Sequence, residues 1–147
     1  MAIWGYALFA LAAGAMLPIQ FGINAQLARF VDSPVRAALI SFAVGTLGLL
    51  VVTLAAFRAW PSERVADAPW WVWAGGLLGA FYVLGSIVAA PKLGAVTLTA
   101  AVIAGQTTAS VLVDQFGWVG FKEHHISAGR LIGVLLVAGG VALVRIF

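Results

Sequence analysis

The chain has no cysteine, which excludes disulfide bonds, thiolate catalysis and cysteine-based metal sites. It also has little charge, since only 9% of its 147 residues are Asp, Glu, Lys or Arg. A soluble domain carries about 25%, because its surface must face water. Hydrophobic residues make up 63% of the chain. A chain so poor in charge cannot cover itself against water, so we expect lipid to surround part of it.

The basic residues do not form a nucleic-acid surface. Eight Lys and Arg residues against five Asp and Glu residues give a net charge of +3. The basic residues are scattered singly rather than clustered on one face. They stand at the edges of apolar runs, where the cationic side chains of membrane proteins belong. We therefore expect the lipid bilayer as a partner, and no nucleic acid.

Four long stretches lack any charged residue, and each is long enough to span a bilayer core, which takes about 20 apolar residues. A fifth stretch lies between Arg130 and Arg145, whose side chains can reach from its ends to the headgroups. The sequence thus predicts an all-α integral membrane protein with a single transmembrane domain over residues 1–147. The five expected helices are residues 3–28, 36–57, 70–90, 93–115 and 126–147.

Lys and Arg are divided evenly between the two sides of this topology. One side carries Arg29, Arg36, Lys92 and Arg145, and the other carries Arg58, Arg64, Lys122 and Arg130. A fixed orientation normally produces a clear imbalance. Either one loop residue dominates, or copies insert both ways and pair antiparallel. The odd helix number suits the second reading, in which two copies form a ten-helix inverted-repeat bundle of the kind found in many transporters.

Small residues recur at helical spacing in several of these stretches. Gly75 and Gly79 form one GxxxG pattern, and Gly129 and Gly133 form another, with Gly140 two turns further on. Small residues let helices approach closely in lipid, where packing drives association. The stripes indicate close helix packing, either within one subunit or between two.

The first predicted helix carries polar groups inside an apolar run. Pro18 has no N–H, so the carbonyl of Gly14 loses its helical donor. Gln20 and Asn24 are four residues apart and therefore share a helix face. Broken helices near the middle of the membrane are a recurring feature of transporter sites. The alternative is that these amides only join helices, at about 1 kcal/mol or less each.

The fourth predicted helix carries a second polar stripe. Gln106, Ser110 and Asp114 follow at spacings of four, and Thr99 lies seven residues before Gln106. Asp114 is a candidate for coupling to a proton or cation, but its place near the helix end favours an ion pair with Lys or Arg. Two polar stripes on two helices predict a polar cavity. Tyr82 is a further candidate that could stack on a substrate.

No enzyme chemistry is expected, because the sequence shows no nucleophile–base pair, metal triad or phosphate loop. His124 and His125 are adjacent in a connection, and adjacent residues rarely converge on one ion. We therefore expect no metal and no cofactor.

These residues together resemble a known family. The first helix contains Leu17-Pro18-Ile19-Gln20 and Asn24-Ala25-Gln26-Leu27, and the resemblance extends along nearly the whole chain. Further matching segments are Ser33-Pro34, Ser41-Phe42 with Gly45, Pro69-Trp70-Trp71 with Gly75-Gly76 and Gly79, Ala90-Pro91-Lys92-Leu93-Gly94-Ala95, Gly105-Gln106, Asp114 with Phe116-Gly117, and Gly129-Arg130 with Gly133. Their order and spacing resemble the YdcZ family of the drug/metabolite transporter (DMT) superfamily.

The resemblance implies a transporter built as an antiparallel dimer of five-helix subunits in the bacterial cytoplasmic (inner) membrane. The dimer is expected as a homodimer, or as a heterodimer with a paired homologue. Compared with the related small multidrug resistance proteins, the chain lacks a buried glutamate in its first helix. This departure speaks against simple proton-coupled export of cations.

The leading hypothesis is a secondary transporter that moves a small polar or amphipathic metabolite or drug by alternating access. Gln20, Asn24, Gln106, Ser110 and Tyr82 would contact the substrate, Pro18 would break the helix, and Asp114 could take part in coupling. A small dimeric ion channel is the first alternative, and it would need a continuous polar pore. A membrane protein that assembles with another without transporting anything is the second.

Overall fold

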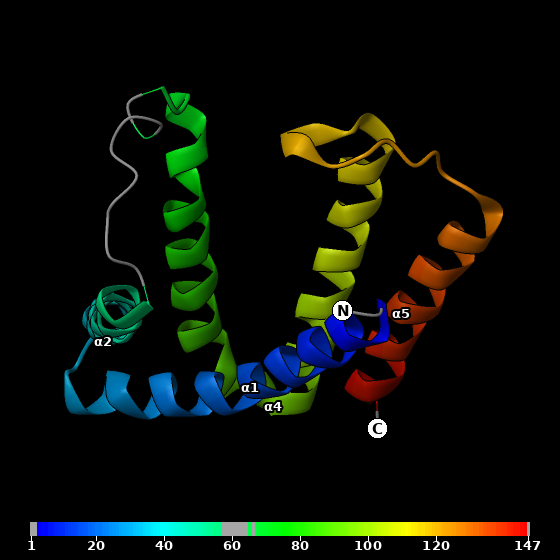
Figure 1. Ribbon diagram of the computed structural model, residues 1–147. Helices are drawn as coiled ribbons and strands as arrows, with labels where there is room; N and C mark the ends of the chain where they lie inside the picture. The colour runs from blue at the N-terminus through cyan, green and yellow to red at the C-terminus, as the bar shows by residue number, and fades with distance from the viewer. Residues whose placement is uncertain (1–2, 57–64, 66, 147) are drawn as a thin grey trace. The chain divides into compact units, whose positions relative to one another are not determined.

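The computed structural model describes residues 3–56, 65 and 67–146. These residues form helices and connections, with no β-strand among them (Figure 1). The helices are α1 (Ile3–Phe30), α2 (Pro34–Ala56), α4 (Ala74–Phe116) and α5 (Ala128–Ile146), with short 3₁₀ turns η1 (Trp70–Trp73) and η2 (Trp118–Gly120). The expected helix ends at residues 57 and 147, together with Arg58 and Arg64, lie outside the described residues.

Two of the helices begin where a serine caps the first turn. The Ser33 hydroxyl accepts the backbone N–H of Arg36 at 3.3 Å, and Pro34 occupies the first helical position of α2. At the start of α5, the Ser127 hydroxyl accepts the N–H of Arg130 at 3.3 Å. Both arrangements satisfy a backbone donor that the first helical turn leaves without a partner.

Helix α4 is interrupted at Gly94, where φ is 75° and ψ is 167°. A residue with a Cβ rarely adopts this conformation, so glycine is needed at the break. The expected helices 70–90 and 93–115 therefore appear as one element of 43 residues that contains a kink, preceded by η1. Within the described residues, four helical stretches are long and apolar enough to cross a membrane.

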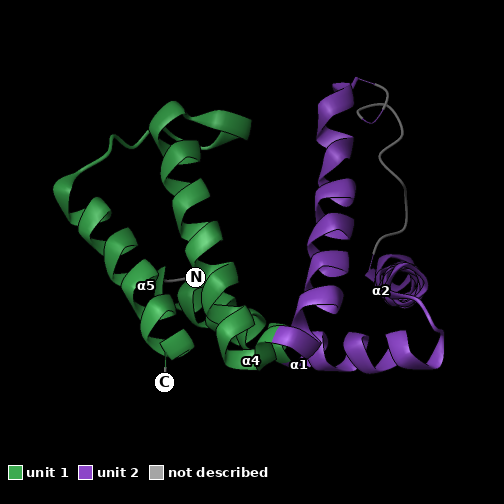
Figure 2. Cartoon of the chain, turned by 180° about the vertical axis from the view of Figure 1, so that it is seen from behind, with its two compact units in different colours: residues 1–18, 93–147 green, residues 19–92 purple. Residues whose placement is uncertain are grey.

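The chain divides into two compact units, which Figure 2 colours separately. One unit is residues 19–92, which comprise the second part of α1, all of α2 and the first part of α4. These three helical segments run in clearly different directions (Figure 2). The other unit is residues 1–18 and 93–147, in which the second part of α4 and α5 lie side by side (Figures 1 and 2).

Apart from Leu98, the buried residues of the described chain all lie in the unit of residues 19–92. Its core consists of Ala37, Ala38, Val83 and Ile87, with Tyr82 packed against them. Large apolar side chains elsewhere are exposed, and no residue of α5 is buried within the described structure. Lipid or further protein must therefore cover these helices.

Candidate functional site

The polar residues predicted from the sequence lie beside two cavities, one in each unit. The first, here called the Gln20 cavity, has a volume of about 230 Å³ and belongs to the unit of residues 19–92. The second, here called the Gln106 cavity, measures about 320 Å³ and belongs to the other unit. Each is described separately below.

Three helical segments line the Gln20 cavity. Its lining residues are Gln20 from α1, Ser41, Phe42, Gly45, Thr46 and Leu49 from α2, and Val83 from α4. The amide and the two hydroxyls supply polar groups in otherwise apolar walls. A few polar groups placed in an apolar hollow are typical of small-molecule sites.

Asn24 lies one turn of α1 beyond Gln20 and is only 3% exposed. Its side-chain Nδ2 is fully buried and has no hydrogen-bond partner among the described residues. Tyr82 packs edge-on against Phe21, with ring centroids 6.0 Å apart and an interplanar angle of 65°. Its hydroxyl is likewise buried without a partner in the described structure. Neither residue is among those that line the Gln20 cavity.

The Gln106 cavity brings together the polar residues predicted on the fourth helix. Gln106, Ser110 and Asp114 all line it, with Ala109 and Val113 between them. The Ser110 hydroxyl donates to the Gln106 carbonyl at 2.7 Å, so its proton is already used within the helix. Its oxygen can still accept a hydrogen bond from a ligand. Val119 and Phe121, which follow α4, complete the walls.

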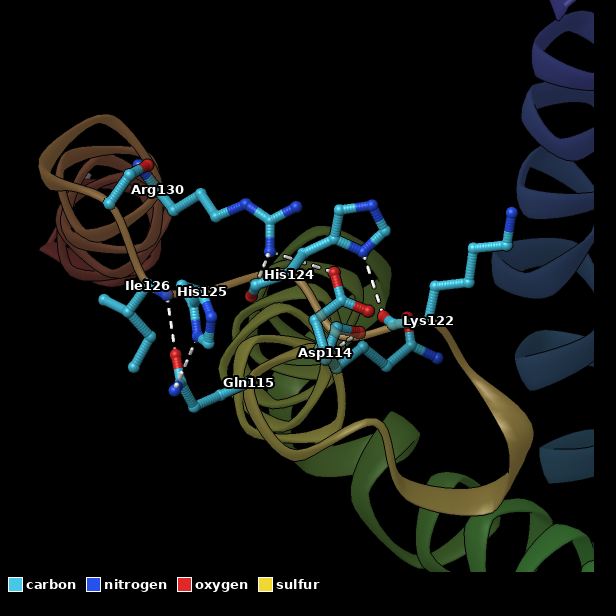
Figure 3. A network of polar contacts seen from close by, with 10 residues as sticks. Asp114, Gln115, Lys122, His124, His125, Ile126 and Arg130 are labelled. Carbon is cyan, nitrogen blue, oxygen red and sulfur yellow. Dashed lines mark hydrogen bonds and ion pairs between the residues drawn. The ribbon is translucent and has the colours of Figure 1, made fainter.

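Asp114 forms an ion pair at the edge of the Gln106 cavity. Its Oδ2 accepts a hydrogen bond from Nη1 of Arg130 at 3.0 Å (Figure 3). The same nitrogen donates to the carbonyl of His124 at 3.3 Å. A pairing of Asp114 with a basic residue agrees with its position at the end of a span. It also joins the end of α4 to the start of α5.

Further hydrogen bonds fix the segment between α4 and α5 (Figure 3). The Gln115 side chain accepts the N–H of Ile126 at 2.6 Å, and the N–H of His124 donates to the Asp114 carbonyl at 2.8 Å. Nδ1 of His124 lies 3.0 Å from the carbonyl of Lys122, so it must carry the proton. Nδ1 of His125 instead lies 3.4 Å from the amide nitrogen of Gln115. The two histidines thus have separate partners.

In the part of the chain that the structure describes, we find no group of three His, Cys, Asp or Glu residues that could hold a metal ion. Pro18 lies inside α1, which continues past it as one helix rather than ending there, and lines a third hollow of about 340 Å³ with Thr99 and Ile103. The Thr99 hydroxyl is buried and has no partner among the described residues.

Some cavity residues were missed by sequence reasoning. Ser41 and Gly45 entered the sequence analysis as part of the resemblance to a family, and Thr46 was not singled out. Their place in the Gln20 cavity depends on which face of α2 meets α1 and α4, and small residues suit both packing and a cavity wall. Gln115 was also missed, because its bond to Ile126 spans 11 residues across an irregular connection.

Long apolar helices that carry polar cavities define a multi-pass integral membrane protein. The family described as "Putative inner membrane exporter, YdcZ" matches residues 5–143, and the chain belongs to this family. The chain is also similar to Inner membrane protein YdcZ of Escherichia coli (strain K12), with 29% identity over 145 residues and 93% of each chain covered. No solved structure matches the chain. It is thus a multi-pass protein of the cytoplasmic membrane and, in general terms, a membrane transporter.

Proposed function

We propose that the chain is one subunit of a dimeric secondary transporter that moves a small polar or amphipathic solute by alternating access. The observation that carries this proposal is the setting of the predicted polar residues. Gln20 lines one cavity, and Gln106, Ser110 and Asp114 line another, in helices that are otherwise apolar. Polar groups at membrane depth are costly and mark solute pathways.

Five crossings fit this function better than four. A continuous helix of 43 residues, the length of α4, would measure about 65 Å at the usual rise per residue. That is more than twice the thickness of a bilayer core, which is about 30 Å. The break at Gly94 supports one crossing before it, over residues 74–93, and one after it, over residues 95–116.

The open glycine faces support an interface between two subunits. A Cβ added at Gly75, Gly129, Gly133 or Gly140 would meet nothing within 4 Å in the described structure. A Cβ added at Gly79, by contrast, would lie 3.5 Å from Cζ of Phe42. A glycine stripe without a neighbour among the described residues is suited to close contact with a second copy. With an even charge count and five crossings, that copy is proposed to be inverted.

Asp114 is the proposed coupling residue. Its carboxylate lines the Gln106 cavity and pairs with Arg130, so protonation of Asp114 would remove the charge that holds Arg130. Arg130 would then be free to shift together with α5. The cavity would thus have two states, one with the ion pair formed and one with it broken.

The test is solute flux in proteoliposomes that contain the purified chain, measured with a panel of labelled polar and amphipathic solutes. We expect saturable uptake that a solute preloaded on the other side accelerates. Replacing Gln20, Asn24 and Gln106 together by Leu should abolish it, whereas Gln26→Leu, an exposed change on α1, should not. Unsaturable ion flux would favour a channel, and no flux with any solute would favour an assembly partner.

Orientation is tested with single cysteines in this cysteine-free chain. Phe30→Cys at the end of α1 and Ile126→Cys before α5 lie at exposed positions on opposite sides of the proposed topology. In intact cells, an impermeant thiol reagent should label about half of each population if copies insert both ways. Complete labelling of one position and none of the other would overturn dual topology.

A further inference from the structure

The unit of residues 19–92 contains a buried donor with no acceptor. Asn24 is 3% exposed, and its Nδ2 has no hydrogen-bond partner among the described residues. Leaving a buried donor unpaired destabilises the folded state. Such a cost persists in a structure when a partner from outside the chain takes up the donor. Asn24 therefore indicates that something with an acceptor oxygen binds nearby.

A second unpaired group lies in the same unit. The Tyr82 hydroxyl is buried without a partner in the described chain, and its ring contacts Phe21. Phe21 is three residues before Asn24, so the two occupy the same face of α1. The phenol and the amide thus offer two donors from two helices.

The neighbouring cavity has room for a ligand but no charged group. Gln20 stands one turn before Asn24, and Val83 follows Tyr82, so lining residues of the Gln20 cavity are close in the chain to both donors, which do not line it themselves. None of its lining residues is ionisable. Arg36 is the basic residue of α2. It does not line the cavity, and its side chain donates to the carbonyl of Val31 at 3.3 Å.

A charged solute would be poorly held in this environment. Burying an ion without a counter-charge costs several kcal/mol even after relaxation, whereas a neutral carbonyl gains a hydrogen bond from each donor. The volume of about 230 Å³ exceeds the roughly 150 Å³ of an apolar cavity that binds benzene. One ring with a polar substituent therefore fits, with its apolar body against Phe42 and Leu49.

We infer that the Gln20 cavity binds electrically neutral solutes that combine a small apolar or aromatic body with a carbonyl-type acceptor, and that the Asn24 and Tyr82 side chains turn toward the bound solute and donate to that acceptor. This inference rests on the proposed transport function, because it names the class of solute that the transporter would carry. It goes beyond that function in excluding organic cations and anions from this site.

Three probes of nearly the same shape test the charge requirement. Benzamide is neutral at pH 7, benzoate is an anion and benzylammonium is a cation. Binding of each to the purified full-length protein in detergent is measured by isothermal titration. We expect benzamide to bind at least tenfold more tightly than either ion. Equal or tighter binding of an ion, or no binding of benzamide, would overturn the inference.

Two variants test the donors. Asn24→Leu and Tyr82→Phe should each weaken benzamide binding at least tenfold, while the exposed Gln26→Leu should leave it unchanged. Neither donor has a partner to lose in the described chain, so both variants should keep or raise the melting temperature of the probe-free protein. A lower melting temperature with unaltered binding would show that these groups only pack the helices.

Flux separates this inference from the proposed function. Benzamide that binds through Asn24 but never crosses proteoliposomes in a saturable manner would contradict transport and leave the binding class standing. Saturable flux of benzoate or benzylammonium that survives Asn24→Leu would support transport and contradict the binding class.

Discussion

Asp114 and Arg130, 16 residues apart in sequence, form an ion pair with 3.0 Å between Oδ2 and Nη1. The pair links the end of α4 to the start of α5, and the segment that connects these two helices has little regular structure of its own. Both side chains are about one-third exposed, at 30% and 36%, so solvent weakens the attraction between them. The ion pair at the Gln106 cavity is therefore weak, which would suit the movement proposed for transport.

The first prediction concerns that pair. Arg130→Gln and Asp114→Asn should each lower the free energy of unfolding in mixed detergent by about 1 kcal/mol, near the upper end for partly exposed pairs. The double variant should lose little more than either single one, because both remove the same interaction. Full additivity of the two losses would contradict a direct interaction. Lys122→Gln, which removes a nearby exposed charge, serves as the control.

The second prediction concerns Gly117, which has φ of 58°. An added Cβ would lie 2.8 Å from Cγ of Glu123 and 3.3 Å from the Phe121 carbonyl. Gly117→Ala should destabilise the protein by about 1–2 kcal/mol, because a left-handed residue with a Cβ is strained and the side chain also has a neighbour to displace.

Gly120→Ala is the matched control, since Gly120 has φ of 87° but nothing within 4 Å of an added Cβ in the described chain. The loss in melting temperature should be smaller at Gly120 than at Gly117. Adding Glu123→Ala should restore part of the loss at Gly117 and none at Gly120. If Gly117→Ala and Gly120→Ala lowered the melting temperature equally, with and without Glu123→Ala, then Glu123 would not crowd Gly117.

Much of the fold follows from the sequence. Uncharged runs predicted the helices within a few residues at most ends. Helix α2 starts at Pro34, two residues before the expected start at residue 36, because proline suits the first helical position. A break near Pro91–Gly94 was also predictable, since glycine tolerates the positive φ that interrupts α4. These features are local, so the chain itself specifies them.

The candidate site was predictable only in part. Spacings of four placed Gln106, Ser110 and Asp114 on one face, and the structure places all three on one cavity wall. The burial of Asn24 and Tyr82 depends on how α2 packs against α1 and α4, which periodicity does not specify. The roles of Ser41 and Thr46 depend on the same packing.

The third prediction concerns the dimer. Gly133→Leu should raise the dissociation constant of the purified dimer at least tenfold, because the proposed interface needs a small residue there. The subunit itself should not be destabilised, since nothing in the described structure lies within 4 Å of an added Cβ.

Gly139→Leu is the matched control for this variant. Gly139 is equally open in the described structure but lies on a different face of α5, about 80–120° around the helix from the three glycines of the stripe at 3.6 residues per turn. Single-molecule photobleaching in lipid vesicles gives the dimer fraction of each variant. An unchanged dimer with Gly133→Leu, or an equal loss with Gly139→Leu, would remove α5 from the interface.

The last prediction concerns Pro18, which lies inside α1 and lines a hollow with Thr99. Proline leaves the carbonyl of Gly14 without its helical donor, and a proline in a helix interior costs about 3 kcal/mol relative to alanine. Pro18→Ala should therefore raise the free energy of unfolding by up to that amount while slowing solute counterflow several-fold, because a straight, fully bonded α1 bends less readily. Pro34→Ala is the control, since proline at a first helical position replaces no helical bond, and it should change both quantities little. Faster or unaltered counterflow in a stabilised Pro18→Ala protein would show that the proline in α1 has no part in transport.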